Sequence, residues 1–143
     1  MRIAVDFDGT IVEHAYPAIG KEKLFAFRTL NELQKIGCRL ILWTYRTGKE
    51  LDEAVEFCRN NGIEFYAVNK SFPEEIVDEN SNRKIEADIF IDDKNLGGFP
   101  GWDVVWQMLN PEGNNIEQST NITTNRKSLI KNIRKVFNNP KNK

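Results

Sequence analysis

Short, almost wholly apolar segments alternate with helical stretches along the first 110 residues, and this alternation constrains the fold more than any other feature of the sequence. Four apolar segments are predicted strands: 3–5, 39–43, 63–68 and 89–91. Three periodic stretches are predicted helices: 21–36, 49–61 and 102–109. Strands separated by helices of this length predict an α/β fold, with a Rossmann-like parallel sheet of about four strands, in the order 4-1-2-3, and helices on both faces.

The distribution of charge divides the chain into a globular core and an appendage. Residues 1–117 contain all 21 acidic residues and carry a net charge of −8, whereas the remaining residues carry +7. We therefore predict a core over residues 1–112, followed by a polar linker and a basic amphipathic helix within 113–143. We expect this helix to dock on the acidic core or on a second copy of the chain, which would give a homo-oligomer. The alternative is a basic arm for a membrane surface or a nucleic acid.

Composition excludes several classes of protein. No apolar run approaches the roughly 18 residues that a membrane span needs, and the N-terminus does not resemble a signal peptide. Two cysteines, Cys38 and Cys58, are too few for a disulfide framework. These observations predict a cytoplasmic protein without a membrane span.

Carboxylates and a hydroxyl follow the predicted strands at the points where the strands end. Asp6 and Asp8 end the first strand on the same side, Thr44 follows the second, and an acidic pair follows the fourth. Carboxyl ends of parallel strands share one edge of a sheet, which is where such folds bind ligands. Carboxylates held this close repel one another unless a cation lies between them or one is protonated, and oxygen ligands suit Mg²⁺. The sequence therefore favours a magnesium site at this edge over a solvated acidic turn.

The order of these groups resembles the haloacid dehalogenase-like superfamily. The segment Asp6-Phe7-Asp8-Gly9-Thr10 matches its first motif, and the apolar run that ends at Thr44 resembles its second. Lys84 resembles the third-motif lysine, with Lys70 and Lys94 as alternatives, and Asp92-Asp93 resembles the acidic fourth motif. Three further segments resemble a small capless bacterial branch: Tyr16-Pro17-x-Ile19-Gly20, Leu42-Trp43-Thr44-x-Arg46 and Ala87-Asp88-x-Phe90-Ile91-Asp92-Asp93.

The resemblance implies a phosphatase, a Mg²⁺-dependent phosphohydrolase that acts through an aspartyl-phosphate. Asp6 would be the nucleophile and Asp8 the general acid and base. Thr44 and Lys84 would bind the phosphoryl oxygens. The implied metal ligands are the Asp6 carboxylate, the Asp8 backbone carbonyl and Asp92, with Asp93 either a ligand or hydrogen-bonded to one.

Three residues have weaker assignments that stay open at this level. Arg46 either binds a substrate anion or is a surface guanidinium. His14, the only histidine, either contacts the leaving group or is solvated within the loop predicted over 11–20. Thr10 is expected to brace the turn rather than touch substrate.

The intervals between the motifs also restrict the substrate. Residues 11–43 and 45–83 leave no room for a folded cap domain. An open site suits a small phosphorylated molecule or a phosphate exposed on a larger partner, and the −8 charge of residues 1–117 argues against nucleic acid.

Two other functions fit part of the pattern. A receiver-type signalling domain carries its acidic pair after the first strand and its phosphorylated aspartate later, whereas this chain has the reverse order. A catalytically silent scaffold of the same fold is the third hypothesis.

Overall fold

The computed structural model describes residues 1–78, 80 and 83–110. Within them it confirms the predicted α/β fold. The elements in chain order are β1 (Arg2–Val5), α1 (Ala26–Lys35), β2 (Arg39–Leu42), α2 (Gly48–Asn60), β3 (Ala67–Val68), β4 (Ile89–Ile91) and α3 (Trp102–Leu109).

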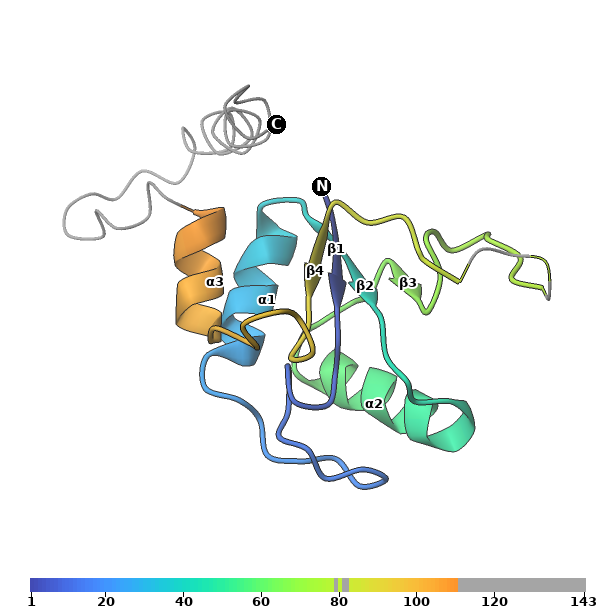
Figure 1. The fold of residues 1–143 in the computed structure, drawn as a ribbon, viewed down its shortest axis with the longest axis horizontal. Helices are drawn as coiled ribbons and strands as arrows, with labels where there is room; N and C mark the ends of the chain where they lie inside the picture. Colours follow the sequence, from blue (N-terminus) through green and yellow to red (C-terminus); the bar gives the residue numbers. More distant parts are fainter. Residues whose placement is uncertain (79, 81–82, 111–143) are drawn as a thin grey trace. The chain divides into compact units, whose positions relative to one another are not determined.

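All four strands are parallel and form one sheet in the order β3-β2-β1-β4, which is the predicted order counted from the other edge (Figure 1). The register pairs Ala4 of β1 with Ile41 of β2 and with Phe90 of β4. The described residues contain no large cap domain, as predicted. The carboxyl ends of all four strands therefore lie at the same edge.

Both helices of the first compact unit, Met1–Trp102, lie on one face of the sheet. The rings of Phe27 in α1 and Phe57 in α2 are 5.6 Å apart, and Asn31 Nδ2 donates to the carbonyl of Asn61. We expected helices on both faces. In this unit they share one face because the right-handed crossovers from β1 to β2 and from β2 to β3 step in the same direction. The described residues between β3 and β4 form turns and loops.

The core surrounds the central strands. Ile3, Val5, Leu40 and Leu42 are at most 1% exposed, as expected for strands covered on both faces. Ala4, Ile41, Ala67 and Ile85 form a second buried cluster, against which partly buried side chains pack: Trp43, Tyr66, Ala87 and Phe90. This cluster replaces a helix on that face of the sheet.

The loop after β1 is a short hairpin, which we call the flap (residues 11–23). Val12 and Glu22 form an antiparallel bridge, and Lys23 N donates to the carbonyl of Ile11. A Cβ at Gly20 would lie 1.9 Å from the carbonyl oxygen of Glu13, so this close approach requires glycine. In Figure 1 the flap extends from the end of β1 beyond the carboxyl edge of the sheet.

Two elements are shorter than predicted because their first residues form other hydrogen bonds. The helix expected from residue 21 begins at Ala26 because residues 21–23 pair within the flap and Phe25 adopts a φ of 66°. The strand expected over 63–68 is limited to Ala67–Val68 because Ile63 N donates to the end of α2 and Glu64 N donates to Gln34.

Helix α3 begins at Trp102, and from Asp103 onward it belongs to the second unit of the chain. The predicted boundary after residue 112 lies outside the described residues, as do the basic helix within 113–143 and its expected docking or oligomer contact. Among the helices of the described part, none has both the length and the apolar character needed to cross a membrane.

Candidate active site

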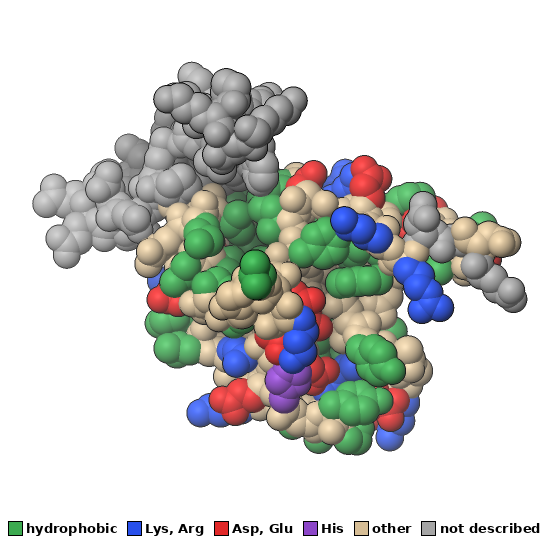
Figure 2. Space-filling view, viewed as in Figure 1, with side chains coloured by type: hydrophobic (Ala, Val, Ile, Leu, Met, Phe, Trp, Pro, Cys, Tyr) green, Lys and Arg blue, Asp and Glu red, His purple; other side chains and the backbone are tan. Residues whose placement is uncertain are grey.

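A pocket of about 720 Å³ opens at the carboxyl edge of the sheet and collects most of the predicted site residues. It is lined by Asp6, Asp8, His14, Tyr16, Trp43, Thr44, Tyr45, Thr47, Asn69, Arg83, Asp92, Asp93 and Lys94. In Figure 2 the one histidine, in purple, lies beside acidic (red) and basic (blue) side chains. The prediction that strand ends would converge on one edge is confirmed for these residues.

Three carboxylates meet in this pocket. One oxygen each of Asp6, Asp92 and Asp93 lies within 4.8 Å of the other two. Asp6 follows β1 and the acidic pair follows β4, and Asp6 N donates to Ile91 O at 2.9 Å, which continues the pairing of the two strands. Adjacent parallel strands thus hold the triad in place.

The Thr10 hydroxyl links the two sides of this triad. It donates to Asp6 Oδ2 at 3.1 Å and accepts from the backbone N–H of Asp93 at 3.0 Å. Thr10 is fully buried, and its carbonyl accepts from the Trp102 indole N–H at 2.8 Å. The predicted bracing role of Thr10 is therefore confirmed.

The triad is electrostatically costly without a cation. Burial, with a smaller contribution from Asp92 and Asp93, raises the pKa of Asp6 to about 6. Burial also raises the pKa of Asp93, but hydrogen bonds from His14 and Lys94 outweigh it, and the net pKa is lowered. Three hard oxygen donors this close together fit a Mg²⁺ ion, which Asp6, Asp92 and Asp93 would hold. The Asp8 side chain is not part of the triad.

The raised pKa of Asp6 predicts a pH-dependent penalty in metal-free protein. Folded Asp6 binds its proton more tightly than unfolded Asp6, so stability falls as pH rises from about 4 to 6. In EDTA, Asp6→Asn should therefore melt a few degrees higher than the wild type above pH 6, with the difference shrinking toward pH 4. Thermal melts followed by circular dichroism measure this, and parallel pH profiles of the two proteins would contradict it.

Asp8 is paired with Arg46 rather than with the triad. Arg46 donates to both Asp8 oxygens, from Nε and Nη2, at 2.7 Å each. The Arg46 side chain is fully buried, and each of its three nitrogens donates at least one hydrogen bond within the protein. Of the two expectations for Arg46, the surface guanidinium is wrong because the side chain is buried, and the contact with a substrate anion stays a prediction.

The basic groups of the pocket differ from those predicted. Lys84 is exposed and does not line the pocket. Lys70 donates to the carbonyl of Pro73 and also lies outside the lining. Lys94, one of the alternatives, lines the pocket with its Nζ 3.0 Å from Asp93 Oδ2, and Arg83 also lines it.

Thr44 follows the end of β2, and Asn69 follows the end of β3. Thr44 N donates to Asn69 Oδ1 at 2.8 Å, and the Thr44 hydroxyl accepts from Arg46 N at 3.3 Å. Both residues line the pocket, as predicted for Thr44.

His14 is brought to the site by the flap. Its Nε2 lies 2.8 Å from Asp93 Oδ2 across 79 residues of sequence. Gly9, at φ +92°, makes room for this contact, because a Cβ there would lie 2.4 Å from His14 Nε2 and 2.5 Å from Asp93 Oδ2. The sequence signal for His14 was weak: a single histidine in a loop.

The chain is similar to a solved structure. A conserved protein from Bacteroides thetaiotaomicron is 52% identical to this chain, with a TM-score of 0.73, and the match covers 83% of this chain and 98% of that protein. This chain belongs to the same family as that protein. No protein-family model and no curated protein matches the chain.

Proposed function

We propose that this protein is a Mg²⁺-dependent phosphohydrolase of the haloacid dehalogenase-like superfamily, acting on a phosphomonoester. The observation that carries the proposal is the acidic triad of Asp6, Asp92 and Asp93 in an open pocket that Thr44 also lines. The carboxylates supply a nucleophile and metal ligands, and the hydroxyl supplies a donor for phosphoryl oxygens.

The chain's own residues can account for both half-reactions. An Asp6 oxygen attacks phosphorus, the bond from phosphorus to the ester oxygen breaks, and Asp8 gives a proton to the departing oxygen. Asp8 then takes a proton from a water molecule that attacks phosphorus, which breaks the bond to Asp6 and releases inorganic phosphate. A bound Mg²⁺ would offset the repulsion between the carboxylate and the phosphate.

The pocket also supports a proposal about the substrate. It is open, no large cap covers it in the described residues, and Tyr16, Trp43 and Tyr45 contribute aromatic surface beside the carboxylates. We expect a small phosphomonoester or a phosphate presented by a larger partner in the cytoplasm. The net charge of −8 over residues 1–117 disfavours nucleic acid.

The test is hydrolysis of p-nitrophenyl phosphate and of a panel of phosphorylated metabolites, with Mg²⁺ and with EDTA. We expect phosphate release that requires Mg²⁺, measured as inorganic phosphate. Stable phosphorylation of Asp6 without turnover would instead support a signalling domain. No release from any member of the panel and no phosphorylation would contradict the proposal.

A further inference from the structure

We propose that Arg46 is a positioning residue that holds the Asp8 carboxylate and the flap in one fixed arrangement. The part of this inference that concerns proton transfer rests on the proposed function, and the part that concerns the flap does not. Arg46 follows Thr44 by two residues and lies outside the triad that would hold the metal ion.

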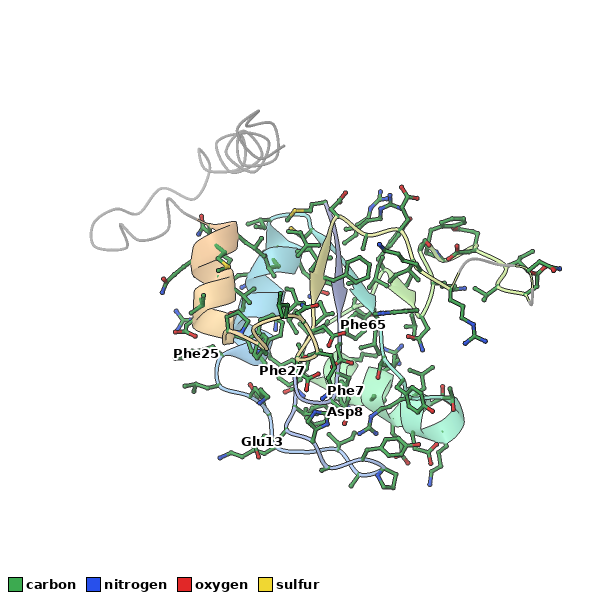
Figure 3. The ribbon with its side chains drawn as sticks, in the orientation of Figure 1. Phe7, Asp8, Glu13, Phe25, Phe27 and Phe65 are labelled. Carbon is green, nitrogen blue, oxygen red and sulfur yellow. The ribbon has the colours of Figure 1, made fainter. Side chains whose placement is uncertain are left out.

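The contact with Asp8 is bidentate. Arg46 Nε donates to Oδ2 and Nη2 donates to Oδ1, at 2.7 Å in both cases. A planar guanidinium that meets both oxygens fixes the plane of the carboxylate as well as its position, which a lysine cannot do. Figure 3 shows Asp8 just past the end of β1. Because Asp8 lines the pocket, the lone pairs that Arg46 leaves unused are the ones available to a ligand.

The same guanidinium holds the flap. Nη1 donates to Pro17 O at 2.9 Å and Nη2 donates to Ala18 O at 2.7 Å. The guanidinium carbon also lies 5.3 Å from the centre of the Tyr16 ring and 4.9 Å from that of Phe7. Three consecutive flap residues therefore contact one side chain, which also contacts the proposed acid.

Burial of the Arg46 side chain restricts the guanidinium to the partners described above. The Arg46 side chain is 0% exposed, whereas that of Asp8 is 15% exposed. A buried charge must be paired and fully hydrogen-bonded, and the described residues leave no buried side-chain nitrogen or oxygen without a partner. If Arg46 moved toward a substrate, it would break four hydrogen bonds. Arg46 thus acts on the substrate through Asp8 and the flap.

Backbone groups of Arg46 also contact Thr44 and Asn69, which line the pocket. Arg46 N donates to the Thr44 hydroxyl at 3.3 Å, and Asn69 Nδ2 donates to Arg46 O at 3.5 Å. The end of β2 therefore places the hydroxyl and the guanidinium together. A displaced guanidinium should alter proton transfer, because two of its four side-chain hydrogen bonds go to Asp8.

The first readout is dependence on the leaving group. An alkyl phosphate needs a proton on its departing oxygen, whereas p-nitrophenyl phosphate does not. Arg46→Met and Arg46→Lys should lower kcat on the alkyl phosphate about tenfold more than on the aryl phosphate. Asp8→Asn should show the same pattern, and the double variant Asp8→Asn/Arg46→Met should lose little more than Asp8→Asn alone. Equal losses on both substrates, with additive effects, would overturn the positioning of Asp8.

The second readout needs no activity. Release of the flap should accelerate tryptic cleavage after Lys21 and Lys23 in Arg46→Met. The control is Arg59→Met, which removes an exposed arginine of α2 and should cleave like the wild type. Unchanged cleavage in a folded Arg46→Met protein would overturn the contact with the flap. If the wild type hydrolyses neither substrate, the proposed function and the proton-transfer part fail together, and cleavage still decides the flap part.

Folding is the remaining control. Arg46→Met leaves Asp8 without its partner, so it should be less stable than the double variant, in which no charge is left unpaired. If Arg46→Met does not fold, Arg46→Lys provides both readouts. If Arg46→Met, Arg46→Lys and the double variant all fail to fold, Arg46 is needed for the fold as a whole rather than for the placement of Asp8. That outcome would overturn the inference.

Discussion

Replacing Asp6 with asparagine should abolish phosphate release from every substrate that the wild type accepts, with a loss on the order of 10³-fold or more. The side-chain amide of asparagine is too weak a nucleophile to form the aspartyl-phosphate, so neither half-reaction can proceed. The fold should survive because asparagine can still accept the hydrogen bond from the Thr10 hydroxyl. The measurement is kcat on p-nitrophenyl phosphate with saturating Mg²⁺, alongside the thermal melt.

The matched control is Asp52→Asn, which removes an exposed aspartate from α2 outside the pocket. It should keep wild-type activity. If Asp6→Asn retained more than about a tenth of wild-type kcat, Asp6 would not be the nucleophile. Turnover would then have to proceed by direct attack of water.

A second large effect is expected at Lys94. Its Nζ is 3.0 Å from Asp93 Oδ2, and this hydrogen bond raises the pKa of Lys94. Lys94→Met removes a pocket cation that can stabilise negative charge on a transferring phosphoryl group, so kcat should fall about 10²-fold. Lys84→Met should change kcat only a few-fold, because Lys84 is exposed and does not line the pocket.

The resemblance of Lys84 to the third-motif lysine predicts the opposite result, with a large loss of kcat in Lys84→Met and a small one in Lys94→Met. Both substitutions replace one lysine with methionine and so remove the same charge. Lys70→Met serves as a third comparison, because Lys70 donates to the carbonyl of Pro73 and does not line the pocket. A large loss in Lys84→Met with an active Lys94→Met would mean that Lys84 turns into the pocket when substrate binds. It would also restore the third motif to the position that the sequence predicts.

The sequence by itself determined the fold class, the strand order and the acidic edge. Apolar runs of strand length, separated by helical stretches, are compatible with few arrangements other than a parallel sheet. Short, right-handed crossovers then leave few possible strand orders, and the predicted order is one of them. The carboxylates followed from the same logic. Asp6, Asp92 and Asp93 each come directly after a strand, so local sequence alone places them at one edge.

Boundaries were less predictable where long-range hydrogen bonds compete with local propensity. The helical pattern that starts at residue 21 is real, but residues 21–23 pair with the other side of the flap instead. The apolar segment 63–68 is likewise tied at its start to the ends of α1 and α2. The first choice depends on pairing with residues 11–13 and the second on Gln34 and Cys58, all of which lie outside the segment that shows the pattern.

The partners of the site side chains were decided only by the tertiary structure. Arg46 meets Asp8 across 38 residues, and His14 meets Asp93 across 79. Neither spacing follows a helical or strand period, because each contact forms where the flap folds back over the carboxyl edge. The same packing decides that Arg46 is buried and that Lys94, rather than Lys84, lines the pocket. Burial and long-range pairing depend on the whole chain, and for that reason the sequence indicated which residues reach the edge but not which of them touch.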